Sequence, residues 1–219
     1  MLKSFMYAGI AVMSFGLASS ALAAVNLSTG TDTDGDGVDD TWTVESGPIS
    51  GPAFIPANIV STYAAPANRW ITPRLGNEQG INSPATVPEG VYNFKGVVNL
   101  SSITSIGSWV TWKGNIFSDN SIVDILVNGT SMGFSSTGFG SGTPFSFSFN
   151  ALSGNNTFVI KLNNASGGGY NPAALRVDQT SLTAAVPEPG TWLLMILGLG
   201  AVGFAMRRRQ AATVRYQFS

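Results

Sequence analysis

The sequence contains no cysteine and no histidine among its 219 residues. Without these side chains, the chain alone cannot build a Ser-His-Asp triad, a cysteine nucleophile, a zinc finger or a histidine-based metal centre. The absence of cysteine also excludes a disulfide framework. It does not indicate the compartment, because many exported bacterial domains carry no cysteine.

Charge is also scarce, since only 11% of the residues are charged. The chain is rich in glycine (26 residues), contains 11% aromatic residues and has a mean hydropathy of +0.20. This composition is too apolar for a disordered chain and indicates a folded, β-rich domain.

The N-terminus has the organisation of a secretory signal peptide, predicted over residues 1–23. Lys3 supplies a positive charge, Phe5 to Ala18 form an apolar stretch, and Ala21-Leu22-Ala23 is a cleavage site of small residues. The alternative is a first helix of the fold. Cleavage by signal peptidase would leave a mature chain that begins at about Ala24 and folds outside the cytoplasm.

The C-terminus contains a second apolar run, in the stretch VPEPGTWLLMILGLGAVGFAMRRR. Residues 190–206 carry no charge, and a helix of this length is about 25 Å long, slightly less than a hydrocarbon core of about 30 Å. The arginines that follow would stay on the cytoplasmic side, whereas a buried core helix would not need them. The run therefore predicts a single transmembrane helix.

These features together resemble the PEP-CTERM sorting signal of Gram-negative bacteria. The resemblance rests on Pro187-Glu188-Pro189, the short apolar span after it, and the cluster Arg207, Arg208 and Arg209. It implies transient membrane insertion, recognition by an exosortase and removal of the tail near the Pro-Glu-Pro motif. The domain would then reach the cell envelope, the outer surface or the extracellular matrix. The expected organisation is a signal peptide (1–23), a domain (24–185) and a sorting signal (186–219).

Removing both ends leaves an acidic protein. Residues 24–188 contain six basic residues and all twelve acidic residues of the chain, so their net charge is about −6. Nucleic-acid binding needs a basic surface that neutralises phosphates. The charge balance therefore argues against a nucleic-acid partner.

Alternating patterns between the two ends predict an all-β domain. Apolar and polar residues alternate in several short runs separated by Gly, Asn, Ser and Pro, and no run has a helical period. We expect one antiparallel β-sandwich of jelly-roll type, flanked by the signal helix and the transmembrane helix. The residues expected inside are Phe147, Phe149, Ile125, Val127, Phe158 and Ile160.

Three segments of this domain resemble a β-sandwich that recurs in PEP-CTERM proteins. They are NRWITP (68–73), SDNSIVDILVNG (118–129) and NPAALRV (171–177). That sandwich is similar to the galactose-binding-like modules of carbohydrate-active proteins. The resemblance implies a location and a shape more firmly than an activity.

The string DTDGDGVDD (32–40) contains the strongest chemical pattern. Carboxylates at loop positions 1, 3, 5 and 9 with glycine at position 6 match an EF-hand-like calcium loop, whose alternate side chains converge on one cation. Position 12 is Thr43 instead of glutamate, and the alternative is an acidic hairpin turn. The candidate ligands of a structural Ca²⁺ are Asp32, Asp34, Asp36, the Val38 carbonyl and Asp40.

Aromatic residues offer surfaces on which sugar rings can stack, but they also fill sandwich cores. The sequence contains Trp42, Trp70, Trp109, Trp112, Tyr63, Tyr92 and Tyr170. The candidate carbohydrate-binding residues are Trp112, Asp119 and Asn120, the last two in an expected loop.

No catalytic residue is assigned, because the acids outside the loop form no pair spaced for glycoside hydrolysis. We therefore expect a non-catalytic envelope or matrix protein. The alternative is a carbohydrate-binding module whose partner is the cell's own exopolysaccharide.

Overall fold

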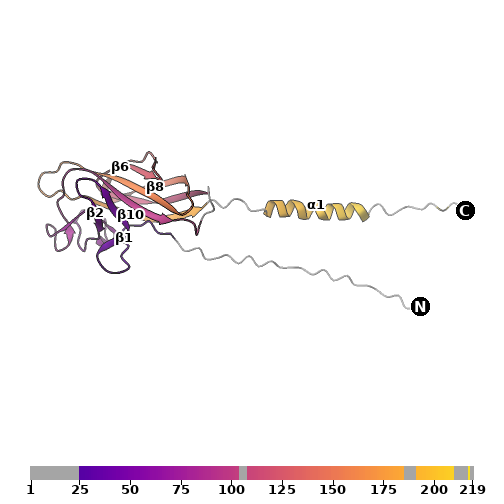
Figure 1. Ribbon diagram of the computed structural model, residues 1–219, viewed down its shortest axis with the longest axis horizontal. Coiled ribbons are helices and arrows are strands. Elements are labelled where there is room, and N and C mark those ends of the chain that lie inside the picture. The colour runs from indigo at the N-terminus through magenta and orange to yellow at the C-terminus, as the bar shows by residue number, and fades with distance from the viewer. Residues whose placement is uncertain (1–24, 104–107, 185–190, 210–216, 218–219) are drawn as a thin grey trace.

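The computed structural model describes residues 25–103, 108–184, 191–209 and 217, and it shows strands followed by one helix (Figure 1). The longer strands are β1 (Val38–Ser46), β5 (Gly90–Asn99), β6 (Trp109–Val127), β8 (Ser136–Asn150), β9 (Asn155–Asn164) and β10 (Ala174–Ala184). The short elements are β2 (Gly51–Phe54), η1 (Ala67–Arg69), β3 (Leu75–Gly76), β4 (Ser83–Pro84) and β7 (Thr130–Ser131). The helix is α1 (Thr191–Arg209).

The strands form two layers that share strand β6. The sheet order is β10-β6-β9-β5-β1-β2, with β7 and β8 also paired to β6, and each pair of named strands is antiparallel. Residues 110–119 of β6 pair with β10, and residues 109–122 of β6 pair with β8, with register shifts after Ile116 and Ser118. Residues 121–127 of β6 pair with β9 in the other layer. The predicted antiparallel β-sandwich is confirmed.

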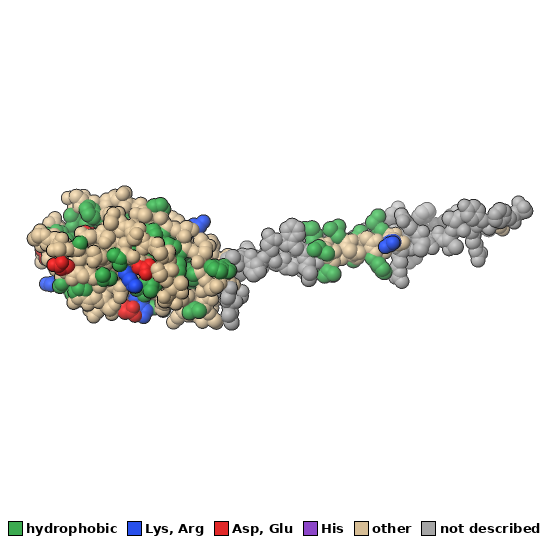
Figure 2. Space-filling view, turned by 90° about the horizontal axis from the view of Figure 1, so that it is seen from above, with side chains coloured by type: hydrophobic (Ala, Val, Ile, Leu, Met, Phe, Trp, Pro, Cys, Tyr) green, Lys and Arg blue, Asp and Glu red, His purple; other side chains and the backbone are tan. Residues whose placement is uncertain are grey.

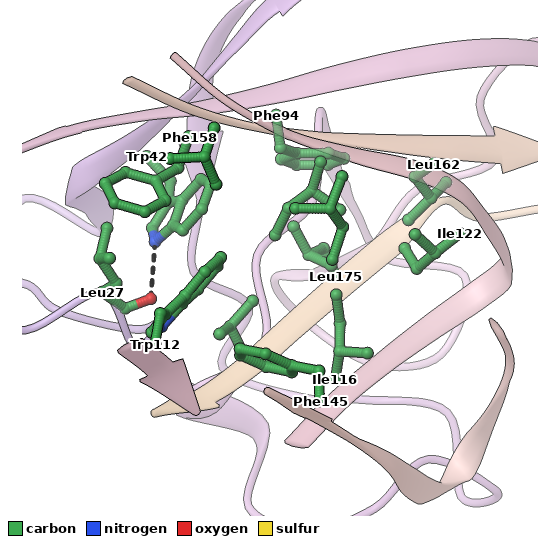
Figure 3. Close-up of a cluster of buried hydrophobic side chains, with 14 of the residues drawn as sticks. Leu27, Trp42, Phe94, Trp112, Ile116, Ile122, Phe145, Phe158, Leu162 and Leu175 are labelled. Carbon is green, nitrogen blue, oxygen red and sulfur yellow. Dashed lines mark hydrogen bonds between the residues drawn. The ribbon is translucent and has the colours of Figure 1, made fainter. Parts of the chain in front are cut away.

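The core lies between the layers, and strand alternation fills it. Strand β8 turns Phe145, Phe147 and Phe149 inward and its serines outward, because successive side chains of a strand point to opposite faces. The other layer contributes residues of β1, β5, β9 and the second half of β6. Figure 3 shows side chains of both layers meeting. The six residues expected inside are all buried: Phe147, Phe149, Ile125, Val127, Phe158 and Ile160.

The first described residues belong to the sandwich, although no strand is assigned to them. Leu27 is buried, and its carbonyl oxygen accepts a hydrogen bond from Trp42 Nε1 at 3.2 Å (Figure 3). Thr29 N–H donates to the Val177 carbonyl of β10, and Gln179 Nε2 donates to the Val25 carbonyl. The two ends of the domain therefore lie side by side along β10.

The predicted C-terminal helix is confirmed as α1, and its described side chains, residues 194–207, are all exposed. Figure 2 shows apolar side chains along it. Within the described residues, no helix is long and apolar enough to cross a membrane. The sequence predicts a transmembrane span over these residues, and this finding corrects that prediction. The uncharged part of α1, residues 191–206, rises only about 24 Å, and the helix ends in arginines.

Two predicted segments lie outside the described residues. They are the signal peptide with its Ala21-Leu22-Ala23 cleavage site and the Pro187-Glu188-Pro189 motif. The boundaries 1–23, 24–185 and 186–219 stay predictions.

Replacement of the aromatic side chain of Phe158 by alanine should destabilise the sandwich strongly. Phe158 is fully buried, and its ring centroid lies 5.0 Å from that of Trp112 and 5.5 Å from that of Phe149. We expect Phe158→Ala to lower the free energy of unfolding by about 3–5 kcal/mol, because it removes apolar contacts and leaves a cavity. Urea unfolding measures the change. Val97→Ala on the neighbouring strand, at a side chain 43% exposed, should change it by less than about 0.5 kcal/mol. Similar losses in both variants would contradict this core.

Candidate functional site

The acidic loop before β1 brings three carboxylates together at its tip. One oxygen from each of Asp32, Asp34 and Asp36 lies within 4.8 Å of the others, and all three side chains are exposed. Backbone N–H groups of Gly35 and Gly37 donate to the two Asp32 oxygens at 2.7 and 3.0 Å. Desolvation opposes ionisation, but the backbone hydrogen bonds outweigh it and hold the pKa of Asp32 below its usual range. The tip therefore brings three carboxylate groups together, and the turn stabilises the ionised form of Asp32.

The base of the loop uses the next two aspartates differently. Asp39 is buried, and its carboxylate accepts backbone N–H groups from residues 30, 31, 41 and 42 at 2.6–3.2 Å. Burial raises the pKa of Asp39 although these four donors act to lower it. Asp40 accepts the backbone N–H and the hydroxyl of Thr33, at 2.8 and 2.7 Å. Both residues close the loop.

Three of the four predicted carboxylate ligands thus come together, and Asp40 lies outside the group. Val38, the fifth predicted ligand, begins β1 and donates its N–H to Asp36 Oδ1 at 2.8 Å. Three close carboxylates repel one another in the absence of a cation. Their oxygens suit Ca²⁺, which accepts six to eight oxygen ligands in irregular geometry, including water. The donor set therefore fits a calcium ion at the loop tip.

The structure contradicts Trp112 as a sugar-binding residue. Its side chain is fully buried, and its ring centroid lies 4.6 Å from that of Phe145 and 5.0 Å from that of Phe158. Trp112 alternates in phase with Val110 and Ile116, which are also buried, so the strand turns it into the core. Its indole nitrogen has no hydrogen-bond partner among the described residues.

Asp119 and Asn120 lie within β6 and not in the expected loop, and their polar atoms bond inside the protein. The Tyr63 hydroxyl donates to Asp119 Oδ2, and Asn120 Nδ2 donates to Asp119 Oδ1 at 2.9 Å. Asn120 Oδ1 accepts the Ala165 N–H at 2.7 Å. Burial raises the pKa of Asp119, against the lowering effect of the Tyr63 hydrogen bond. These side chains tie β6 to neighbouring loops, which is a structural role.

A second, smaller apolar cluster lies next to Asp119. Tyr63, Trp70 and Phe117 pack together, with centroids 4.5 Å apart for Tyr63 and Trp70. The Arg176 guanidinium lies 4.6 Å from the Phe117 ring centroid and donates to Asp178 and to the carbonyls of residues 64 and 65. The aromatic residues of this cluster therefore hold the segment between β2 and β3 against the sheet.

Among the tryptophans whose burial the structure describes, one is exposed: Trp109, the first residue of β6, at 55%. It borders a hollow of about 350 Å³ together with Leu152, which is 52% exposed. The other residues that line the hollow are Val127, Asn128, Thr130, Met132, Ser148, Phe149 and Asn150. An exposed aromatic ring beside a hollow with apolar and amide side chains can bind a small organic ligand.

Sequence reasoning did not select this hollow, although one signal was present. Trp109 alternates in phase with Thr111 and Lys113, whereas Trp112 alternates with apolar residues. The polar phase marks the outer face of a strand. The turns that complete the hollow come from distant parts of the chain, and alternation within one strand carries no information on them.

The C-terminal segment matches a known sorting motif. Residues 185–209 match the PEP-CTERM protein-sorting motif, which confirms the predicted motif. The match includes Arg207, Arg208 and Arg209 at the end of α1, where the Arg207 side chain is exposed. No curated protein matches this sequence.

Several solved structures show distant likeness to the chain. A GH26-CBM35 β-(1,4)-mannanase from Podospora anserina is 12% identical with a TM-score of 0.32, and the match covers 70% of this chain and 27% of the mannanase. A carbohydrate-binding module CBM36, solved in complex with calcium and xylotriose, is 14% identical with a TM-score of 0.25 and coverages of 51% and 88%. CBM35 from Paenibacillus barcinonensis is 18% identical with a TM-score of 0.25 and coverages of 50% and 77%. These likenesses are too distant to indicate a ligand or an activity.

The buried carboxyl of Asp119 should make stability depend on pH. Because its pKa is raised in the folded protein, the folded state holds the proton more tightly than the unfolded state does. The free energy of unfolding should therefore fall as the pH rises from the usual value of 3.8 through the raised pKa. In Asp119→Asn this decrease in the free energy of unfolding should be absent. The decrease amounts to about 1.4 kcal/mol for each pH unit by which the pKa of Asp119 is raised.

Urea unfolding from about pH 4 to about pH 7 measures the difference between the two proteins. Glu89→Gln, at an exposed side chain, is the control and should follow the wild type. A difference between wild type and Asp119→Asn that does not change with pH would contradict the prediction.

Proposed function

We propose that this chain is a non-catalytic exported protein whose folded β-sandwich is delivered to the cell envelope by its C-terminal sorting signal. The PEP-CTERM motif at residues 185–209 is the observation that carries the proposal. The motif implies processing by an exosortase. Signal peptidase would process the other end, and the outer surface or the extracellular matrix would be the destination.

The position of the domain's ends supports processing on both sides. Val25 and Thr29 lie against β10, whose last residue is Ala184. Cleavage at about Ala24 keeps buried Leu27, and cleavage near Glu188 lies beyond the last strand. Neither cut removes a core residue. The sandwich can therefore keep its fold after both ends are removed.

Loss of the motif should leave an unprocessed precursor. We expect Glu188→Ala to accumulate a form that retains residues 192–219, whereas the wild-type protein in its native host lacks them. Intact mass spectrometry of the envelope and secreted fractions measures this. Glu89→Ala is the matched control, because Glu89 also follows a proline but precedes β5. A wild-type protein that mainly retains residues 192–219 would contradict the sorting proposal.

We also propose that Asp32, Asp34 and Asp36 hold one Ca²⁺ with a structural role. The ion would neutralise the loop tip and fix the entry of the chain into β1. The observation in favour is the convergence of three carboxylates within 4.8 Å. Affinity should be modest, with a Kd of about 10⁻⁴–10⁻³ M as in extracellular modules, because Asp40 bonds to Thr33 and position 12 is not acidic.

Calcium should then stabilise the folded state. An ion that binds only the folded protein adds about 1.4 kcal/mol at ten times its Kd, a concentration of about 1–10 mM for the expected affinity. We expect the wild type to melt at a higher temperature in millimolar CaCl₂ than in EGTA. The double variant Asp34→Ala, Asp36→Ala should melt at the same temperature in both solutions, and Glu89→Ala should behave as the wild type does. Equal wild-type melting temperatures would reduce the loop to an acidic turn.

A second candidate function is carbohydrate binding, with the cell's own exopolysaccharide as partner. The predicted residues do not support it, because Trp112 is buried and Asp119 and Asn120 bond internally. The hollow beside Trp109 favours it instead. It is the place where the described surface offers an exposed indole ring next to a concave, partly polar wall.

A further inference from the structure

We propose that the hollow beside Trp109 binds one neutral pyranose ring of a polysaccharide. This inference rests on the carbohydrate-binding candidate above and names the site and the chemical class of the sugar. The volume of about 350 Å³ lies at the lower end of ligand pockets and suits a ring-sized ligand.

Trp109 supplies the stacking surface. Its face carries the negative part of the ring quadrupole, which attracts the weakly positive C–H groups on the apolar face of a pyranose. The indole is already exposed and sits at a strand end. Binding therefore needs no opening of the core, and it removes apolar surface from water. Val127, Met132 and Phe149 continue the apolar wall.

Polar groups with free bonding capacity border this wall. Asn150 pairs with Trp109 in the β6–β8 register, and its side chain is exposed. Thr130, the first residue of β7, is also exposed. Neither side chain has a hydrogen-bond partner among the described residues, so both can bond to sugar hydroxyls. Asn128 is already committed, because its Nδ2 donates to Asn156 Oδ1 and its Oδ1 accepts the Thr157 N–H.

The charge distribution favours a neutral sugar over an acidic one. None of the residues that line the hollow is charged, and residues 125–160 contain no Asp, Glu, Lys or Arg. A uronate carboxylate would lose hydration on entering and would find no cation in the wall to compensate. A neutral ring loses only hydroxyl hydration, which Asn150 and Thr130 can replace.

A lipid surface is the rival partner for an exposed tryptophan at this place. Trp109 is next to Val110, which pairs with Ala184 at the end of β10. The hollow therefore lies at the end of the domain from which the chain continues to the sorting motif. Tryptophan is also favoured at membrane interfaces. The concave wall and the two free polar groups favour the sugar.

Affinity electrophoresis of the protein purified from its host tests the proposal. The gels contain dextran, galactan, mannan or xylan as neutral polymers, or alginate as an acidic polymer. We expect at least one neutral polymer to retard the wild type and alginate to have no effect. Trp109→Ala should weaken binding by about tenfold or more, and Asn150→Ala less. Trp109→Phe should retain part of the binding, and Val97→Ala all of it. Equal melting temperatures of the variants confirm that each is folded.

The outcomes separate the inference from the candidate function. No retardation by any polymer would overturn carbohydrate binding as a whole. Retardation that Trp109→Ala leaves unchanged, or equal retardation by alginate, would overturn this site while carbohydrate binding stands. Cosedimentation with phosphatidylcholine vesicles is the third arm. Vesicle binding lost in Trp109→Ala, without binding to neutral polymers, would assign the surface to lipid and overturn the proposal.

Discussion

Strand β6 places the two layers of the sandwich relative to each other, because one continuous run of 19 residues belongs to both. Its first half lies between β8 and β10, and its second half pairs with β9. The inward phase changes along the strand: Trp112, Ile116 and Ile122 point inward at even positions, whereas Ile125 and Val127 do so at odd positions. The register shift between Ile122 and Asp124 absorbs the change. Such a bulge inserts one residue and bends the strand.

The same strand explains why the cluster around Asp119 is structural. Asp119 lies where β6 passes from one pairing to the next, and a carboxyl buried there needs partners. Tyr63 and Asn120 provide them. Burial still raises the pKa of Asp119, so its hydrogen bonds do not fully repay the lost hydration.

Local patterns were enough to predict the sandwich, but they could not assign every residue to its face. The alternation in β8 and β9 identified Phe147, Phe149, Phe158 and Ile160 as core residues, and all are buried. Trp109 and Trp112 are three positions apart, so a strand must turn them to opposite faces. Because both residues are tryptophans, residue type alone does not predict which of the two indole rings is buried. The hollow beside Trp109 also needs the turn at Asn128 and the end of β8, which only the pairing of distant strands brings together.

The aspartates of residues 32–40 form two groups with different roles, and their spacing alone did not predict this. Alternation correctly grouped Asp32, Asp34 and Asp36, because a tight turn with glycines at 35 and 37 converges alternate side chains. Asp39 and Asp40 instead satisfy backbone N–H groups that the turn leaves without partners.

The charged residues that form ion pairs within the sheets do not line the hollow beside Trp109. Lys95 pairs with Glu45, and Arg176 pairs with Asp178, so several charges of the sheets are bound locally. No charged residue lines the hollow. The first described residues lie along β10, and the register of β10 with β6 continues to Ala184 at the other end of the domain. The hollow beside Trp109 lies near this end of the domain and is lined by uncharged residues. Such a surface meets an uncharged partner without losing an ion pair.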